Sequence, residues 1–194
     1  MPFSNKHTTK LNPNKLVILD RDGVINHDSD AYIKSLSEWV PLPGAIDAIA
    51  KLSLAGFTVA IATNQSGIAR GFYDETTLQA MHDHLQSLVA AKGGQVAHIA
   101  YCPHGPDDHC DCRKPLPGLL VEIQKKLAFE SLEGSWMVGD SLRDLQAGEA
   151  VGSRPVLVRT GKGEKTLSNN VGLEKVIIYR DLAEFADWLC TNKK

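Results

Sequence analysis

The sequence predicts an α/β protein with a Rossmann-like, doubly wound and mainly parallel sheet that carries helices on both faces. Short apolar runs rich in branched residues alternate with segments of helical periodicity along most of the 194 residues. Polar and charged residues collect directly after several of the apolar runs. In a parallel sheet those positions share one edge, which is where such folds bind their ligands.

Six segments are predicted to be strands, because each is a short run dominated by apolar residues and bounded by turn or polar residues. They are residues 15–20, 57–62, 95–101, 135–140, 154–160 and 175–179. Five segments carry helix signals, such as Asp74 as an N-cap or apolar residues at helical spacing in residues 43–56. They are residues 43–56, 74–92, 117–129, 141–150 and 181–190.

The composition is that of an ordinary globular protein, with 43% hydrophobic and 23% charged residues. We expect a polar leader over residues 1–14 and a single domain over residues 15–194. The opening lacks the apolar stretch of a signal peptide, and no apolar run reaches the roughly 20 residues that span a bilayer, so a cytoplasmic location is expected. A net charge of -2 argues against nucleic acid or an anionic membrane as partner. No aliphatic patch stands out, which favours a monomer.

Two acidic residues follow the first predicted strand. Asp20 and Asp22 stand two apart in "DRDG", so both side chains would point to one side if the extended backbone continues. Two converging carboxylates repel each other unless a cation lies between them or one carries a proton. Oxygen ligands of this kind favour magnesium. A solvated acidic turn before Gly23 is the alternative.

Further polar residues stand at other strand ends and at a helix start. Thr63 and the backbone N–H groups after it could receive an anion, although such a stretch can also be an ordinary turn. Asp140 follows the fourth strand, and Lys114 precedes the helix at 117–129. The alternative for Lys114 is an ordinary surface lysine. Asp144 is interpreted as a helix-surface aspartate, with an outer-shell contact to the metal as the alternative.

An acidic pair, a hydroxyl, a lysine and a later aspartate occur in the order typical of the haloacid dehalogenase-like (HAD) phosphohydrolases. The chain resembles that superfamily from about residue 15 to residue 160. The resemblance implies that Asp20 is the nucleophile that becomes phosphorylated and that Asp22 is the general acid and then the base. It implies that Thr63 and Lys114 hold the phosphoryl oxygens. It also implies a magnesium ion bound by Asp20, Asp22 and Asp140.

Three of the four cysteines crowd into "CPHGPDDHCDCRKP", residues 102–115. The candidate zinc ligands are Cys102, His104, Cys110 and Cys112. Four soft or borderline ligands this close suit a tetrahedral zinc ion, with His109 as a less favoured ligand than His104. Redox pairing and unligated cysteines are the alternatives. With no obvious open position the zinc would be structural, and it would fold the loop that delivers Arg113 and Lys114.

Four stretches narrow the resemblance to the D,D-heptose 1,7-bisphosphate phosphatases, zinc-loop members that also resemble the histidinol-phosphate phosphatase domain. They are "LDRDGVIN", "TNQSGIARG", "YCPHGPDDHCDCRKPLPG" and "MVGDSLRDLQA". The resemblance implies removal of the 7-phosphate on the route to the ADP-heptose of lipopolysaccharide core. A phosphatase for histidinol phosphate or another small monoester is the alternative within this class, and a zinc-dependent binding module is the alternative outside it. The zinc loop is shorter than in some relatives, which leaves the preferred anomer open.

The sequence leaves no room for a large cap domain over the site. Residues 23–43 are too few for one, and residues 68–101 are needed for the core. Loops should therefore supply specificity in an open site. The predicted substrate contacts are Asp28, Ser29, Asp30, Tyr32, Asn64, Gln65, Ser66 and Arg113. The alternatives are a polar turn over residues 28–32, a turn cap at Asn64 and a surface arginine at Arg113.

Overall fold

The computed structural model describes residues 11–192 and contains one sheet of six parallel strands in the order β3-β2-β1-β4-β5-β6. The strands are β1 Leu16–Leu19, β2 Thr58–Asn64, β3 His98–Cys102, β4 Trp136–Gly139, β5 Arg154–Val158 and β6 Ile177–Tyr179. The chain builds outward from β1 to β3 on one side, then returns to β4 and builds outward on the other. The order therefore reverses beside β1, and such a reversal creates a ligand-binding crevice at the carboxyl ends of the strands.

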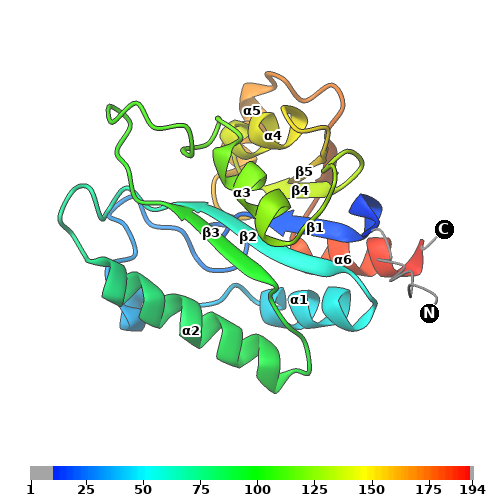
Figure 1. Ribbon diagram of the computed structural model, residues 1–194, viewed down its shortest axis with the longest axis horizontal. Coiled ribbons are helices and arrows are strands. Elements are labelled where there is room, and N and C mark those ends of the chain that lie inside the picture. Colours follow the sequence, from blue (N-terminus) through cyan, green and yellow to red (C-terminus); the bar gives the residue numbers. More distant parts are fainter. Residues whose placement is uncertain (1–10, 193–194) are drawn as a thin grey trace, which may run out of the picture.

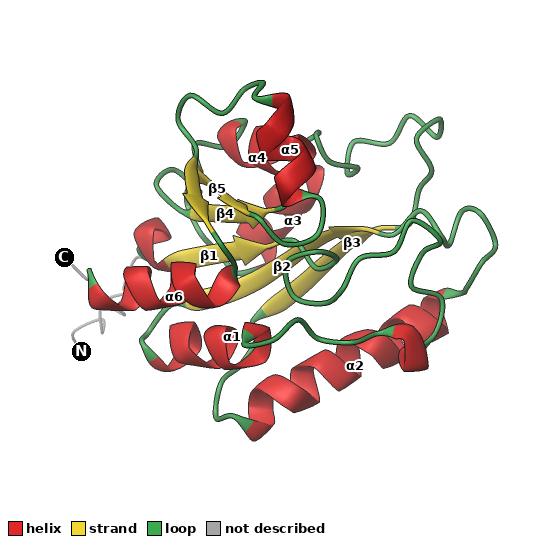
Figure 2. Cartoon of the chain, turned by 180° about the vertical axis from the view of Figure 1, so that it is seen from behind, coloured by secondary structure: helices red, strands yellow, loops and turns green. Residues whose placement is uncertain are grey.

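Helices cover both faces of the sheet, as predicted (Figure 1). The helices are α1 Ala45–Leu54, α2 Glu75–Ala91, α3 Gly118–Lys126, α4 Leu142–Glu149, α5 Gly163–Asn169 and α6 Leu182–Thr191. Figure 1 shows α1, α2 and α6 on one face and α3, α4 and α5 on the other, and Figure 2 shows the same layers from behind. No helix within residues 11–192 combines the length and the apolar character needed to cross a membrane.

The strand that precedes Asp20 is buried on both of its faces. All four side chains of β1 are 0% exposed: Val17 and Leu19 belong to the core under α1, α2 and α6, while Leu16 and Ile18 belong to the core under α3 and α4. Burying one such side chain stabilises the fold by about 1.5–3 kcal/mol. The backbone that enters Asp20 is therefore rigidly held.

The structure adds an element that the sequence did not predict. Helix α5 has the polar sequence "GEKTLSN", in which only Gly163 is buried, so it carries no apolar stripe that would reveal it. Its Thr166 hydroxyl donates a hydrogen bond of 2.8 Å to the carbonyl oxygen of Asp140. The unpredicted helix therefore lies against the predicted site.

Most element boundaries differ from the sequence prediction by a few residues, and two of these differences lie next to β1 and the site. Strand β2 extends to Asn64, so Thr63 and Asn64 belong to the strand itself. The predicted leader falls mostly on residues 1–10, which lie outside the described residues, and Pro13–Lys15 form a short 3-10 helix that leads into β1. Its N-cap is Asn12, whose side chain accepts a hydrogen bond of 3.0 Å from the backbone of Asn14.

Candidate active site

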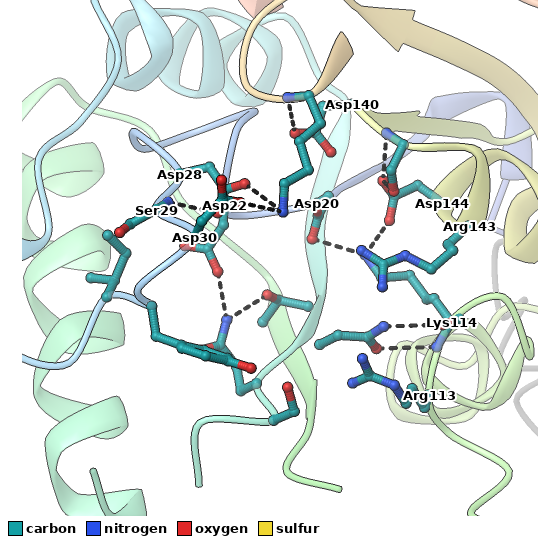
Figure 3. A pocket seen from close by; sticks show the side chains of 18 of the residues that line it. Asp20, Asp22, Asp28, Ser29, Asp30, Arg113, Lys114, Asp140, Arg143 and Asp144 are labelled. Atoms are coloured by element: carbon teal, nitrogen blue, oxygen red, sulfur yellow. Dashed lines mark hydrogen bonds and ion pairs between the residues drawn. The ribbon is translucent and has the colours of Figure 1, made fainter. Parts of the chain in front are cut away.

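A pocket at the carboxyl edge of the sheet is lined by every predicted site residue except the four zinc ligands (Figure 3). These residues are Asp20, Asp22, Asp28, Ser29, Asp30, Tyr32, Thr63, Asn64, Gln65, Ser66, Arg113, Lys114 and Asp140. They come from the ends of β1, β2 and β4 and from the loops after β1 and β3. The topological crevice beside β1 is thus the place where the predicted chemistry meets.

Lys114 lies at the centre of the pocket and is buried. Its Nζ lies 2.8 Å from Oδ1 of Asp20 and 2.6 Å from Oδ1 of Asp144, and it donates a third contact of 2.6 Å to the carbonyl oxygen of Ala62. Burial acts to lower the pKa of Lys114, but the negative charges of Asp144 and Asp20 outweigh it and raise that pKa. Lys114 is therefore a fixed cation and not a surface lysine.

Three carboxylates, of which Asp140 and Asp144 are buried and Asp20 is half-buried, share the floor of the pocket. Oxygen atoms of Asp20, Asp140 and Asp144 lie within 4.8 Å of one another. Burial, followed by the charge of Asp144, raises the pKa of Asp20 to about 7, and burial followed by the charge of Asp20 raises the pKa of Asp140 to about 8. Lys114 alone does not offset this concentration of negative charge. The group fits a divalent cation with oxygen ligands, such as magnesium.

Asp22 has a different environment from Asp20. Its carboxylate accepts hydrogen bonds from Nη2 of Arg21 at 3.0 Å, Nδ2 of Asn26 at 2.8 Å and Nε2 of Gln65 at 2.9 Å. Burial acts to raise the pKa of Asp22, but the charge of Arg21 and these hydrogen bonds lower it. Among the described residues, the carboxylates that gather within metal-binding distance do not include Asp22. Its contact with magnesium stays a prediction.

The Asp140 carboxylate sits in a cradle of backbone atoms. Its Oδ2 accepts a hydrogen bond of 2.8 Å from the backbone N–H of Lys162. A Cβ added to Gly23 would lie 2.0 Å from this oxygen, and a Cβ added to Gly161 would lie 2.2 Å from it. Both positions therefore require glycine, and the two glycines fix where the carboxylate points.

The four predicted zinc ligands also come together. The donor atoms of Cys102, His104, Cys110 and Cys112 lie within 4.8 Å of one another. The Sγ atoms of Cys102 and Cys110 are 3.6 Å apart, and Nδ1 of His104 is 3.3 Å from Sγ of Cys112. Three cysteines and one histidine at these separations fit one tetrahedral zinc ion. All four cysteines of the chain are free, so the structure does not support the disulfide alternative.

Known proteins resemble this chain over most of its length. A family model described as HAD-hydrolase-like matches residues 111–185. A Pseudomonas putida protein named D-glycero-beta-D-manno-heptose-1,7-bisphosphate 7-phosphatase is 64% identical over 172 residues, which cover 89% of this chain and 97% of that protein. The chain belongs to this phosphatase family. The Pseudomonas aeruginosa protein of the same name is 59% identical over 174 residues, which cover 90% of this chain and 97% of that protein.

A solved structure supports the family assignment. The D,D-heptose 1,7-bisphosphate phosphatase from Bordetella bronchiseptica, solved as a complex with magnesium and phosphate, superimposes with a TM-score of 0.89 and 51% identity. The match covers 92% of this chain and 99% of that protein. The HAD-like fold, the phosphatase class and the resemblance to heptose bisphosphate phosphatases are thereby confirmed.

Two residues that were predicted to contact the substrate form hydrogen bonds with other residues of the protein. Asn64 binds the backbone of Lys114 twice: its Nδ2 donates to the carbonyl oxygen and its Oδ1 accepts from the N–H, both at 3.1 Å. Gln65 donates to Oγ1 of Thr63 at 2.8 Å and accepts from the Tyr73 hydroxyl at 2.6 Å. Both side chains thus position the groups expected to hold phosphate.

The interpretation of Asp144 as a helix-surface aspartate is wrong. Asp144 is 1% exposed, pairs with Lys114, and accepts hydrogen bonds from the backbone N–H of Ser141 at 3.1 Å and its hydroxyl at 2.6 Å. The spacing from Ser141 to Asp144 is that of a capping box, which was the available sequence signal. Sequence reasoning also missed five pocket residues, namely Ile33, Tyr73, Ser141, Arg143 and Lys162.

We expect Gly161→Ala to weaken magnesium binding at least about tenfold, because the added methyl group would collide with the Asp140 carboxylate. Gly56→Ala is the matched control: Gly56 also has a positive φ, of 86°, but an added Cβ would meet nothing within 4 Å. Isothermal titration of the substrate-free proteins with magnesium measures the effect. Equal magnesium affinity in the two variants would show that the cradle does not position Asp140.

A buried histidine contacts the guanidinium group of Arg21. His82 on α2 is 3% exposed, and its Nε2 accepts a contact of 3.4 Å from Nη1 of Arg21. Burial, followed by the positive charge of Arg21, lowers the pKa of His82 to about 3. His82 is therefore neutral in the folded protein at pH values where an exposed histidine already takes up a proton.

This histidine should make the stability of the protein sensitive to acid. The folded pKa of about 3 lies below the ordinary histidine pKa of 6.5, so the stability contribution of His82 is present above pH 6.5 and is lost as the pH falls toward 3. Between pH 7 and pH 5 the wild type should lose about 2 kcal/mol more unfolding free energy than His82→Gln. Urea denaturation at several pH values measures the unfolding free energy of both proteins. The contributions of carboxylates that titrate in both proteins cancel in the difference. Parallel stability curves would contradict this expectation.

Proposed function

We propose that this chain is a magnesium-dependent phosphatase that removes the 7-phosphate of D-glycero-β-D-manno-heptose 1,7-bisphosphate through an aspartyl-phosphate on Asp20. The observation that carries the proposal is the Asp20 carboxylate, held 2.8 Å from the Lys114 ammonium at the floor of the pocket. The relatives that are 53–64% identical bear the name of this activity. The product would serve the route to ADP-heptose and lipopolysaccharide core.

In the first step a carboxylate oxygen of Asp20 bonds to phosphorus, and the bond from phosphorus to the C7 oxygen of the sugar breaks. The electron pair stays on that oxygen, which takes the proton of the Asp22 carboxyl group. The Lys114 ammonium and the Thr63 hydroxyl hold the phosphoryl oxygens, on which the transition state spreads its charge. Asp20 and Asp140 would hold a magnesium ion, which when bound would let the anionic carboxylate approach the anionic phosphate.

In the second step Asp22 acts as the base. Its carboxylate takes a proton from water, the water oxygen bonds to phosphorus, and the acyl phosphate bond breaks so that Asp20 is regenerated. Asp22 is ionised in the substrate-free protein, because its pKa is lowered. The first step needs its protonated form, which the negative charge of a bound phosphate favours. Arg21, Asn26 and Gln65 hold the ionised form that the second step needs.

The proposed function comes with a proposed domain organisation, oligomeric state and location. We infer a single domain over residues 15–194 after a polar leader, acting as a monomer in the cytoplasm without a nucleic-acid or membrane partner. A structural zinc ion would be held by the loop cysteines and His104, whose donor set suits it. The net charge of -2 supports the inference that neither nucleic acid nor an anionic membrane is a partner.

A substrate panel tests the function. We expect the purified protein to hydrolyse the β anomer of heptose 1,7-bisphosphate with a higher kcat/KM than the α anomer or histidinol phosphate, and only with magnesium present. A higher kcat/KM for histidinol phosphate would replace the heptose assignment with the histidinol-phosphate alternative. Absence of magnesium-dependent phosphate release from every member of the panel would reject the phosphatase proposal.

A further inference from the structure

The pocket contains four basic side chains, and they are not equally engaged. Lys114 pairs with Asp20 and Asp144, as described above. Nζ of Lys162 lies 3.1 Å from Oδ2 of Asp28 and 3.6 Å from Oδ1 of Asp30. The two arginines, Arg113 and Arg143, pair with no carboxylate among the described residues.

Their remaining contacts are few. Nη1 of Arg113 donates a single hydrogen bond of 3.3 Å, to the carbonyl oxygen of His104. The Arg143 side chain makes no hydrogen bond or ion pair within residues 11–192 and is exposed at the pocket wall. Two guanidinium groups with nine or more free N–H donors therefore face the same pocket.

The position of Arg143 works against the stability of its own helix. It lies in the first turn of α4, whose N-terminus carries the positive end of the helix dipole, and a cation there destabilises the helix. The residues one turn further on, Gln146 and Ala147, are not acidic and offer no ion pair. A residue that breaks a local rule without compensation within the fold indicates a functional requirement.

The opposite walls of the pocket differ in charge. Figure 3 shows Arg113 and Arg143 extending from the side of Lys114, and Asp28, Ser29 and Asp30 on the opposite side. Two like charges on one wall repel each other until an anion lies between them. The planar guanidinium suits phosphate because it can donate two parallel hydrogen bonds, whereas the carboxylates opposite suit the hydroxyl groups of a sugar.

We propose that Arg143 acts together with Arg113 as the subsite for the second phosphate of the bisphosphate substrate, the phosphate that is not removed. This inference rests on the proposed function and deepens it, because it assigns a specificity-determining residue that neither the motifs nor the resemblance indicated. The leaving phosphate lies at Asp20, the second phosphate lies on the arginine wall, and the sugar hydroxyls face Asp28 and Asp30. The arginine pair thus selects bisphosphates over monophosphates.

The test compares a bisphosphate with its matching monophosphate. For each variant we take the ratio of kcat/KM for heptose 1,7-bisphosphate to kcat/KM for heptose 7-phosphate, which lacks the second phosphate. Arg143→Ala should lower this ratio about tenfold, equivalent to about 1.4 kcal/mol, and mainly through KM. Arg143→Lys should fall between, because it keeps the charge and loses the two-pronged hydrogen bond. The control Lys126→Ala removes an exposed cation at the far end of α3 and should leave the ratio unchanged.

The two arginines should also depend on each other. Because both would bind one phosphate, the double variant Arg113→Ala with Arg143→Ala should lower the ratio by less than the product of the single effects. A wild-type ratio in Arg143→Ala overturns the proposal. So does an equal loss of kcat/KM on both substrates, because that pattern indicates a role in phosphoryl transfer or folding.

A second measurement separates this inference from the proposed function. If the wild type releases no phosphate from heptose bisphosphate, the proposed function fails, and inhibition of p-nitrophenyl phosphate hydrolysis then decides the role of the arginines. The wild type should be inhibited more strongly by fructose 1,6-bisphosphate than by fructose 6-phosphate, and Arg143→Ala should lose about tenfold of that preference. An absent preference in the wild type, or an undiminished one in the variant, overturns the proposal.

Discussion

Asp20→Asn is expected to lower phosphate release by at least about 10⁴-fold while the protein stays folded. An amide in this position is uncharged and cannot form the acyl phosphate, so the chain loses its nucleophile and not merely a binding contact. Activity on the heptose bisphosphate at saturating magnesium measures the loss. Acid-quenched wild type incubated with labelled substrate should carry label on Asp20, and the variant should carry none.

The fold should survive this change because the substituted side chain is part of a crowded acidic group. Asp20→Asn removes one of three carboxylates within 4.8 Å of one another, and Lys114 keeps its contacts with Asp144 and the Ala62 carbonyl. The Tm of the metal-free variant should therefore equal or exceed that of the wild type. Asp187→Asn, a matched change at an exposed position of α6, should leave turnover intact. Full turnover in Asp20→Asn, or label on another residue, would refute the mechanism.

The parts of the fold that could be predicted were those whose residues carry their own signal. β1 is a short run of four apolar residues, and its complete burial on both faces of the sheet follows from that composition. Alternation of strands and helices fixes a parallel sheet, and a parallel sheet places the ends of β1, β2 and β4 at one edge. Asp20, Thr63 and Asp140 could therefore be placed together without any knowledge of side-chain contacts.

The parts that could not be predicted depend on contacts between distant segments or on local turns. The spacing argument for Asp22 assumed that extended backbone continues past β1, but the chain turns there: the backbone N–H groups of Val24, Ile25 and Asn26 all approach the carbonyl oxygen of Arg21. The Arg21 side chain forms an ion pair with the carboxylate of Asp22. Asn64 binds the backbone of Lys114, fifty residues further along the chain, and such a contact cannot be predicted from local spacing. Helix α5 left no sequence signal, so its contribution to the Asp140 cradle was invisible.

Removal of the zinc ion is expected to lower kcat by about 10²-fold or more, although no zinc ligand touches the reacting phosphate. Residues 103–109 are mostly exposed and contribute nothing to either apolar core. The zinc ion would therefore supply the stability that this loop does not gain from apolar packing. The loop continues directly into Arg113 and Lys114, and it is tied to β2 by the hydrogen bond of 2.7 Å from Gln65 N–H to the Cys102 carbonyl. Loss of the ion would free the backbone of Lys114, and a misplacement of about 1 Å at a reacting centre costs about 10²-fold in rate.

Cys110→Ser is the variant that tests this coupling, because Cys110 is a ligand at the rim of the core, whereas Cys102 is fully buried within it. The variant should lose bound zinc, measured by elemental analysis, and show faster amide hydrogen exchange over residues 103–117. Its Tm should fall only modestly, because Leu119, Leu120 and Ile123 of α3 remain buried in the core. His109→Asn is the control: His109 lies in the same loop outside the ligand cluster, and asparagine tolerates its φ of 50°. It should keep both zinc and activity. A zinc-free Cys110→Ser protein with wild-type kcat would show that Lys114 is positioned by β2 alone, through Asn64, and that the zinc loop has no part in placing it.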